Sequence, residues 1–295
     1  MATVTAEQTR APRLTSLSPG AGCACKLPLA KLEQLFAGLQ GAPAMGPAAG
    51  DLLVGAAEGD DAAVLRLDDE RALVLTTDFF TPIVDDPVPK YGLAVTGLAD
   101  PARLMTIDRA TPGDQLILTK AIGTGVVATA LKGGQAPEDV ITAAVASMTL
   151  LNAGASQAAL QAGVIAATDV TGFGLLGHLH RMLAASQAAA RVDAASVPLL
   201  PGAAELARAG FISGGTRANT ERMRGFAVVD PAVPAEVAVL LHDAQTSGGL
   251  LLAAPPAAAP ALLDTLRAQG LPAALIGNIV AGESGHVDVY PARSE

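Results

Sequence analysis

The residues best suited to chemistry lie in one short stretch, Gly20–Lys26, with the sequence GAGCACK. It contains Cys23 and Cys25, the 2 cysteines of the 295-residue chain, and Lys26 follows them directly. A thiolate is the reactive form of cysteine, and a neighbouring ammonium group lowers the pKa of a thiol toward neutrality. The glycines leave the backbone free to approach a ligand closely. We therefore interpret this stretch as a reactive loop, with two buried, inert cysteines in an ordinary loop as the alternative.

Two other uses of the cysteine pair are disfavoured. A disulfide between Cys23 and Cys25 would close a very small and strained ring. A structural zinc ion takes four ligands, and the pair supplies only two thiols.

Acidic residues stand at the ends of several predicted strands. Asp60 and Asp61 lead into a strand over 62–65, Asp78 ends a strand over 72–78, and Asp169 follows a strand end that begins the stretch from Ala166. Carboxylates at the ends of neighbouring strands can converge on one cation, and hard oxygen ligands suit Mg²⁺. Aspartate is also a common turn residue, so each position taken alone is open between ligand and turn.

Two segments rich in glycine lead into predicted helices. Gly123-Thr124-Gly125 would present free backbone N–H groups, which is a possible anion site and a weak signal by itself. The segment after Asp169 reads VTGFGLLGH and places Asp169 and the following N–H groups toward a shared cleft. We interpret His178, on the helix, as a structural histidine rather than a ligand.

These residues need a framework of alternating strands and helices. Apolar periodicity predicts a helix over 29–39, strands over 91–98 and 115–119, a long helical stretch over 137–162, a helix over 258–270 and a final strand over 274–279. Residues 1–19 are expected to form a loose arm, and 41–50 a linker. The pattern indicates an α/β (α+β) protein, and the length suggests two domains or one large one.

The composition and net charge restrict the classes of function that the chain can have. Hydrophobic residues make up 51% of the chain, charged residues 16% and aromatic residues 3%, which is typical of a folded globular protein with a core of Ala, Leu and Val. The net charge of −9 argues against nucleic acid as a partner. No apolar run is long enough to span a membrane, and the N-terminus lacks the pattern of a signal peptide. We therefore expect a cytoplasmic protein.

Nine stretches together resemble the selenophosphate synthetase (selenide, water dikinase) family, within the aminoimidazole-ribonucleotide-synthetase-like superfamily of ATP enzymes. In chain order they are GAGCACK, GDDAAV, LTTDFF with PIVDDP, YGLAVTG, LTK with IGTGV, NAGAS, ATDVTGFGLLGHL, SGGT with a following Asn, and QTSGGLLLA. They extend over nearly the whole chain in the family's order, which makes the resemblance far more specific than any one motif.

The resemblance implies a two-domain ATP-binding fold, with an N-terminal arm and catalytic loop over 1–27, an ATP-binding domain over 28–110 and an α/β domain over 111–295. It also implies an activity: a homodimer that converts selenide and ATP, with Mg²⁺, into selenophosphate, AMP and orthophosphate. The implied roles are Cys23 and Lys26 as catalytic residues, with Lys26 also meeting the nucleotide phosphates, Asp61 and Asp169 as Mg²⁺ ligands, Glu58, Gly59, Asp60 and Asp78 as nucleotide contacts, and Cys25 as a secondary cysteine.

The chain departs from the family pattern in one place. Asp85-Asp86-Pro87 runs directly into Val88–Tyr91, whereas family members have roughly fifty further residues there, an ordinary size for a module of two helices and two strands. The resemblance places a third metal-binding aspartate and a Gly-Gly-His nucleotide contact in the absent segment. We therefore expect an N-terminal domain that is truncated, and two hypotheses stay open: an enzyme with a compromised ATP site, or an inactive relative that keeps partial nucleotide binding or dimerisation.

Overall fold

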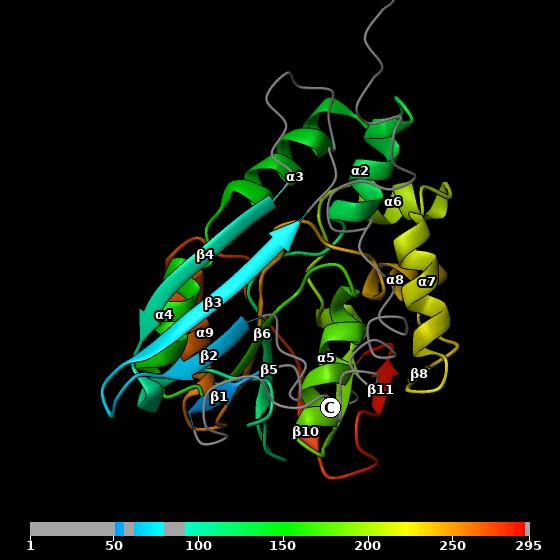
Figure 1. Cartoon of the computed structure of the whole chain (residues 1–295). Helices are drawn as coiled ribbons and strands as arrows, with labels where there is room; N and C mark the ends of the chain where they lie inside the picture. Colours follow the sequence, from blue (N-terminus) through cyan, green and yellow to red (C-terminus); the bar gives the residue numbers. More distant parts are fainter. Residues whose placement is uncertain (1–50, 56–61, 80–91, 293–295) are drawn as a thin grey trace, which may run out of the picture.

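The computed structural model describes residues 51–55, 62–79 and 92–292, which form two β-sheets with helices around the larger one (Figure 1). The smaller sheet has four strands in the order β1-β2-β3-β4, and the larger has seven in the order β6-β9-β5-β10-β7-β11-β8. The mixture of helices and strands agrees with the predicted α/β class. None of the described helices is long and apolar enough to cross a membrane.

The four-stranded sheet is a purely antiparallel meander of β1 (Leu52–Val54), β2 (Ala62–Arg66), β3 (Ala72–Phe79) and β4 (Gly92–Ala99). The strands predicted over 62–65, 72–78 and 91–98 are therefore confirmed to within a residue or two at their ends. The Val- and Leu-rich composition of these segments suits a pleated surface.

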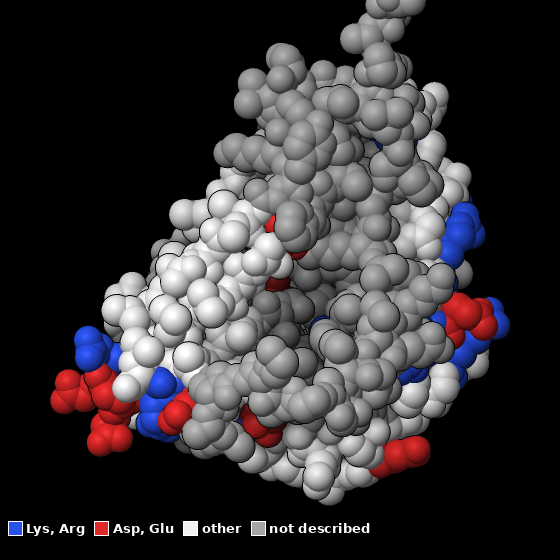
Figure 2. Space-filling model, viewed as in Figure 1, with Lys and Arg blue, Asp and Glu red and all other residues white. Residues whose placement is uncertain are grey.

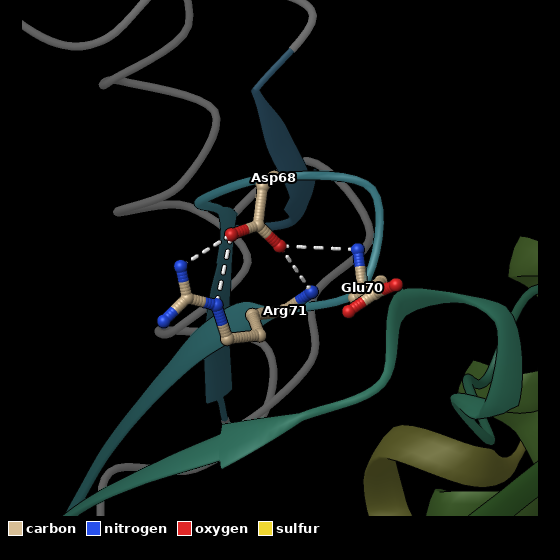
Figure 3. A network of polar contacts seen from close by, with 3 residues as sticks. All are labelled: Asp68, Glu70 and Arg71. Carbon is tan, nitrogen blue, oxygen red and sulfur yellow. Dashed lines mark hydrogen bonds and ion pairs between the residues drawn. The ribbon is translucent and has the colours of Figure 1, made fainter.

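A polar turn closes the β2–β3 hairpin (Figure 3). The Asp68 carboxylate accepts hydrogen bonds from the backbone N–H groups of Arg71 at 2.7 Å and Glu70 at 3.1 Å, and from Nε of Arg71 at 2.8 Å. The side-chain hydrogen bond from Arg71 is the main reason why the pKa of Asp68 lies below its usual range. This local network fixes the register in which β2 and β3 pair.

The four-stranded sheet buries little of its apolar surface. Its core consists of Val54, Val64 and Ala72, and the described residues between 51 and 99 include no helix to cover either face. On β4, Leu93 is 63% exposed and Leu98 is 66% exposed. Because these two side chains lie on opposite faces of the strand, both faces of β4 are exposed. Figure 2 shows uncharged surface over most of this strand, with charged side chains gathered near the β2–β3 turn.

The seven-stranded sheet is mixed. The first five strands in its order pair antiparallel with their neighbours among the five, namely β6 (Ala166–Asp169), β9 (Leu250–Ala254), β5 (Gln115–Leu118), β10 (Ala274–Val280) and β7 (Ala189–Asp193). At one edge, β11 (Val287–Tyr290) pairs parallel with both β7 and β8 (Ala227–Val229). The strand predicted over 274–279 is present as β10, but it is not the last strand, because β11 follows it.

Eight helices are described, all C-terminal to the small sheet: α2 (Thr124–Lys132), α3 (Glu138–Thr149), α4 (Ala153–Gln161), α5 (Gly174–Ala185), α6 (Ala203–Arg208), α7 (Gly214–Met223), α8 (Ala235–Leu241) and α9 (Ala259–Ala268). The predicted helix over 258–270 is confirmed as α9. The long helical stretch predicted over 137–162 is present as two helices, α3 and α4, because the chain is extended at Leu150.

Helices cover both faces of the larger sheet, as the alternation along β5 demonstrates. Leu116 and Leu118 belong to an apolar cluster with residues of α2, α5 and α6, whereas Ile117 belongs to a second cluster with residues of α4 and α9. Many of the buried positions in both clusters are alanines, which lets the helices pack closely on the strands. The result is a rigid platform, and the ends of its strands position the site described next.

Candidate functional site

A pocket of about 420 Å³ lies beside the carboxyl end of β6. Its polar lining comes from the end of β6, the start of α4 and one face of α5, and its apolar lining from the segment before β5 and the start of β9. The lining residues are Met105, Ile107, Asn152, Ala153, Ser156, Ala167, Thr168, Asp169, His178, Arg181 and Leu250. Asp169 is the only carboxylate among these residues. The pocket therefore has one apolar side and one polar side, and the polar side suits an oxygen-rich ligand.

Backbone contacts fix the segment that carries Asp169. The backbone N–H of Val170 donates to the carbonyl oxygen of Gly249 at 2.8 Å, which ties the end of β6 to the start of β9. Gly174 opens α5 with a φ of +71°, and a Cβ there would lie 2.6 Å from the carbonyl oxygen of His242. Only glycine fits this position without moving the backbone. The predicted passage from a strand through Asp169 and glycines into a helix is confirmed.

His178 connects the start of α5 to the turn before it. The residue is 3% exposed, and its Nε2 lies 3.3 Å from Oγ1 of Thr171 and 3.4 Å from the backbone N of Phe173. The guanidinium group of Arg181, one turn further along α5, lies over the Phe173 ring at 5.5 Å. These contacts support the structural role expected for His178, and they also place both basic side chains at the pocket that contains Asp169.

Lys120 holds two loops next to the pocket, and sequence reasoning did not single it out. Lys120 is 1% exposed, and its Nζ donates to the carbonyl oxygens of Leu150 at 2.6 Å and Ser247 at 3.0 Å. Asn152 adds a second link, because its Nδ2 donates to the carbonyl oxygen of Gly248 at 2.9 Å. Burial lowers the pKa of Lys120. Nζ of Lys120 thus binds the carbonyl oxygen of Leu150, the residue at which α3 ends.

The start of α2 is not an open anion site. The Asp243 carboxylate accepts hydrogen bonds from the backbone N–H groups of Gly125 at 3.0 Å and Val126 at 3.2 Å. The Gln245 side-chain oxygen accepts from the N–H groups of Gly123 at 2.9 Å and Thr124 at 3.1 Å. The protein's own side chains thus occupy the groups that the Gly123–Gly125 pattern presented as a possible anion site. That interpretation is wrong for the described structure.

Asp243 is a fully buried carboxylate held by several donors. Besides the two N–H groups of α2, it accepts from Oγ1 of Thr216 at 2.9 Å and from Nε2 of Gln245 at 3.0 Å. Burial raises its pKa to about 6, while these hydrogen bonds act in the opposite direction. The carboxylate is therefore charged at neutral pH and serves as an internal cap for the helix.

Two of the predicted site residues lie within the described part of the chain. Asp169 lines the pocket, whereas Asp78 lies near the end of β3 and does not contribute to the described lining. The other seven, Cys23, Cys25, Lys26, Glu58, Gly59, Asp60 and Asp61, lie outside the described residues. The described residues contain no group of three or more His, Cys, Asp or Glu side chains placed to hold a metal ion.

Known proteins resemble this chain over most of its length. Residues 111–290 match the family "AIR synthase related protein, C-terminal domain". In structure, the fold is similar to AaThiL complexed with AMPPCP and TMP, with a TM-score of 0.55 and 13% identity over 91% of this chain and 95% of that one. This match and the family model together show an AIR synthase-like fold.

Closer relatives carry a specific name. The chain is 36% identical to selenide, water dikinase of Myxococcus xanthus (strain DK1622), with 94% of this chain and 97% of the relative aligned. It is 38% identical to selenide, water dikinase of Bordetella bronchiseptica (strain ATCC BAA-588 / NCTC 13252 / RB50), over 94% of this chain and 98% of the relative. Both alignments extend over 346 positions, more than the 295 residues of this chain, so both relatives contain residues that it lacks. These identities, over more than nine-tenths of the chain, show that it belongs to the selenide, water dikinase family.

Proposed function

We propose that the chain makes selenophosphate from selenide and ATP, with AMP and orthophosphate as the other products. The observation that carries the proposal is that Asp169 lies on the polar side of a pocket. Asp169 belongs to the ATDVTGFG segment of this chain, which is a relative of selenide, water dikinase. Phosphoryl transfer depends mainly on positioning and on neutralising charge, so a carboxylate at a preformed pocket next to basic side chains suits it.

In this proposal the reactive groups come from the N-terminal loop. Cys23 is the catalytic cysteine, and Lys26 meets the phosphates and keeps the thiol of Cys23 easily deprotonated. Cys25 has a secondary role. A loop of this kind would exclude water from the selenide and from the transferring phosphoryl group. Glu58, Gly59, Asp60 and Asp78 contact the nucleotide.

Asp61 and Asp169 are the proposed Mg²⁺ ligands. The pocket fits one part of such a site, since Asp169 is accompanied by the oxygen-bearing side chains of Thr168, Ser156 and Asn152, and hard oxygen ligands suit Mg²⁺. The remaining protein ligands would come from outside the described residues. When bound, Mg²⁺ neutralises part of the charge on the ATP phosphates.

We also propose that the chain acts as a homodimer in the cytoplasm. The support is the exposure of β4, an edge strand on which Leu93 is 63%, Val95 47% and Leu98 66% exposed. Apolar side chains on both faces of an edge strand are unusual for a monomer and suit pairing with a second copy of the chain. Nucleic acid and membrane are not among the proposed partners.

One observation favours a second candidate function. The alignments of 346 positions against a chain of 295 residues show that relatives hold residues this chain lacks. If these residues lie after Pro87 and include a third metal-binding aspartate and a Gly-Gly-His contact, the ATP site is incomplete. The chain would then be an inactive relative that keeps partial nucleotide binding or dimerisation.

The test is AMP formation by the purified chain in ATP, Mg²⁺ and selenide, followed by ³¹P NMR of the selenophosphate product. The proposal expects selenide-dependent AMP formation that Cys23→Ser abolishes without changing the thermal unfolding midpoint, and that Cys25→Ser reduces much less. Absence of AMP formation together with retained Mg²⁺–nucleotide binding would support the second candidate. Equal turnover by Cys23→Ser and the parent would overturn the catalytic role of Cys23.

The proposed metal ligands need a separate measurement. Calorimetry of Mg²⁺–nucleotide binding should show weaker binding for both Asp61→Asn and Asp169→Asn than for the parent chain. The matched control is Asp264→Asn, since Asp264 lies on the exposed surface of α9, away from the pocket. Unchanged affinity in both variants would mean that these acids are turn residues only.

A further inference from the structure

The pocket that contains Asp169 also contains a positively charged side chain to which the proposed function assigns no contact. Arg181 is the one Lys or Arg among the described residues that line this pocket. It comes from α5, whereas Asp169 ends β6, so the acid and the base reach the pocket from different elements. Arg181 is partly buried. A guanidinium group on the polar side of a pocket suits an anionic part of a ligand.

An aromatic side chain holds the guanidinium group of Arg181 in place. The Cζ atom of Arg181 lies 5.5 Å from the centre of the Phe173 ring, and the centre of the His178 ring lies 5.2 Å from the same point. His178 and Arg181 are three residues apart on α5, so they lie on one face of the helix. The cation–π contact with Phe173 restricts the Arg181 side chain without using its N–H donors, which lowers the entropy cost of binding a ligand.

Two other basic side chains near the pocket are buried and held by the protein itself. His178 is 3% exposed, and its Nε2 lies 3.3 Å from Oγ1 of Thr171. Lys120 is 1% exposed, and its Nζ donates to the backbone carbonyl oxygens of Leu150 and Ser247. Among the described residues, Arg181 is therefore the basic side chain best placed to contact an anion in this pocket.

We propose that Arg181 binds the phosphate chain of the nucleotide directly, through hydrogen bonds from its guanidinium group to phosphate oxygens. This inference rests on the proposed function, because that function supplies the ligand with phosphates. A guanidinium group matches phosphate geometry with two parallel N–H···O hydrogen bonds. The Asp169 carboxylate has the same sign of charge as a phosphate and attracts the chain only through a cation. The pocket therefore holds one ligand in two ways, through a metal ion at Asp169 and directly at Arg181.

Removal of the metal ion separates these two kinds of contact. The probe is inorganic tripolyphosphate, and its binding to the full chain is measured by calorimetry, once with EDTA and once with Mg²⁺. With EDTA, Arg181→Gln should bind the probe at least about fivefold more weakly than the parent, because charge-assisted hydrogen bonds are lost. Asp169→Asn should bind it at least as tightly as the parent, because a repulsive charge is removed. With Mg²⁺, both variants should bind more weakly than the parent.

Two further variants show whether the effect belongs to the geometry of Arg181. Arg181→Lys keeps the charge but loses the paired hydrogen bonds, so its affinity with EDTA should lie between those of the parent and Arg181→Gln. Arg222 is the matched control, since it is also partly buried and its Cζ lies 4.4 Å from the centre of the Phe226 ring, but it does not line the pocket. Arg222→Gln should bind tripolyphosphate as the parent does. Equal weakening by Arg181→Gln and Arg222→Gln would overturn the proposal.

A measurement on the parent chain stands even if Arg181→Gln fails to fold. In NMR of ¹⁵N-labelled arginine side chains with EDTA, tripolyphosphate should shift the Arg181 signal and leave that of Arg222 unchanged. The proposal is overturned if the Arg181 signal does not move, if the parent does not bind the probe, or if Arg181→Gln binds it as the parent does.

The AMP assay distinguishes this failure from a failure of the proposed function. AMP formation by a parent whose tripolyphosphate binding does not depend on Arg181 would overturn this inference alone. Binding through Arg181 in a parent that forms no AMP would overturn the proposed activity and keep the role of Arg181 as a phosphate-binding residue.

Discussion

Two neighbouring buried residues, His242 and Asp243, respond to pH in opposite directions. Burial lowers the pKa of His242 from 6.5 to about 4, so between these values the unfolded chain binds more protons on this ring than the folded chain. The free energy of unfolding therefore falls as the pH is lowered through this window. Burial raises the pKa of Asp243 from 3.8 to about 6, so its contribution rises as the pH is lowered. The two effects largely cancel.

Replacing His242 should expose the effect of Asp243. Relative to His242→Phe, the parent chain should lose up to about 1.4 kcal/mol of unfolding free energy for each pH unit between pH 6.5 and 4.5. Urea unfolding of both proteins at several pH values in this range provides the measurement. His286→Phe is the control, because His286 is partly exposed and paired with Asp288. A constant difference between the parent and His242→Phe across this range would contradict the prediction.

Lys120 should matter more for local order than for global stability. Lys120→Met leaves two carbonyl oxygens without a donor but also removes a buried charge that has no acidic partner among the described residues, so the two effects oppose each other. We expect the free energy of unfolding to change by about 1 kcal/mol or less, while the amides of residues 246–250 exchange hydrogen faster. Lys132→Met, at the end of α2, is the matched control. Unchanged exchange over 246–250 would contradict the role of Lys120 as an anchor.

Some residues of the candidate site could be predicted from the sequence, and others could not. Asp169 was predicted because its signal is local: a β-branched and alanine-rich strand, an aspartate and then glycines. Lys120, Asp243 and Gln245 gave no such signal, since each acts through a partner far away in sequence, such as Gln245 with Gly123. The unexpected polarity of a lysine between an apolar strand and a glycine turn was the one available hint.

At the scale of elements, the start of α2 depends on a residue from another part of the chain. Helix N-termini leave several N–H groups unpaired, and here the Asp243 carboxylate and the Gln245 amide satisfy them. The glycines at 123 and 125 permit this approach, because a Cβ on Gly125 would lie 2.3 Å from the carbonyl oxygen of Ala244. Helix start and cap are thus far apart in sequence and adjacent in space.

Removing the Asp243 carboxylate that caps α2 should destabilise the protein. Asp243→Ala leaves four buried donors without an acceptor, and we expect a loss of at least about 3 kcal/mol in the free energy of unfolding. Asp243→Asn keeps an acceptor and should lose roughly half as much. Asp288→Ala removes a partly exposed carboxylate and should change stability by less than about 1 kcal/mol. Urea unfolding of the three variants tests the series, and equal losses for Asp243→Ala and Asp288→Ala would contradict it.

Elements with strong local patterns were predicted, and those that depend on distant contacts were not. The strands β2, β3, β4, β5 and β6 and the helix α9 follow from apolar periodicity and turn residues. The break between α3 and α4 gave no local signal, because Ala-rich sequence favours helix and the Lys120 and Asn152 contacts at the break join residues that are far apart in sequence. The short strand β11 was missed because its pairing with β7 and β8 is set by distant residues.

At the scale of the whole molecule, the two sheets differ in how much of their apolar surface is buried. The seven-stranded sheet has helices on both faces and large apolar clusters. Among the described residues, the four-stranded sheet has three buried core residues, and both faces of β4 are exposed. Sheets in such folds bury at least one apolar face, so the small sheet lacks covering elements among the described residues. The relatives, whose alignments are longer than this chain, contain residues that could supply them.

Inserting the missing residues should therefore repair the small sheet. We expect that a relative's segment, placed between Pro87 and Pro89, raises the thermal unfolding midpoint, because apolar surface on β4 contributes roughly 25 cal/mol for each Å² that becomes buried. It should also reduce concentration-dependent association through the edge strand β4, and increase selenide-dependent AMP formation. Calorimetry, light scattering and the AMP assay measure these three effects on the same pair of proteins.

The control is an insertion of the same length made of glycine and serine, which lengthens the loop without adding apolar surface or carboxylates. This insertion should lower stability only slightly, since the entropy of loop closure grows slowly with length. If it matches the relative's segment in stability and activity, the segment adds nothing specific. If the parent chain already forms AMP as fast as a full-length relative, the absent residues are dispensable, and the four-stranded sheet as it stands, with β4 exposed, is sufficient for the reaction.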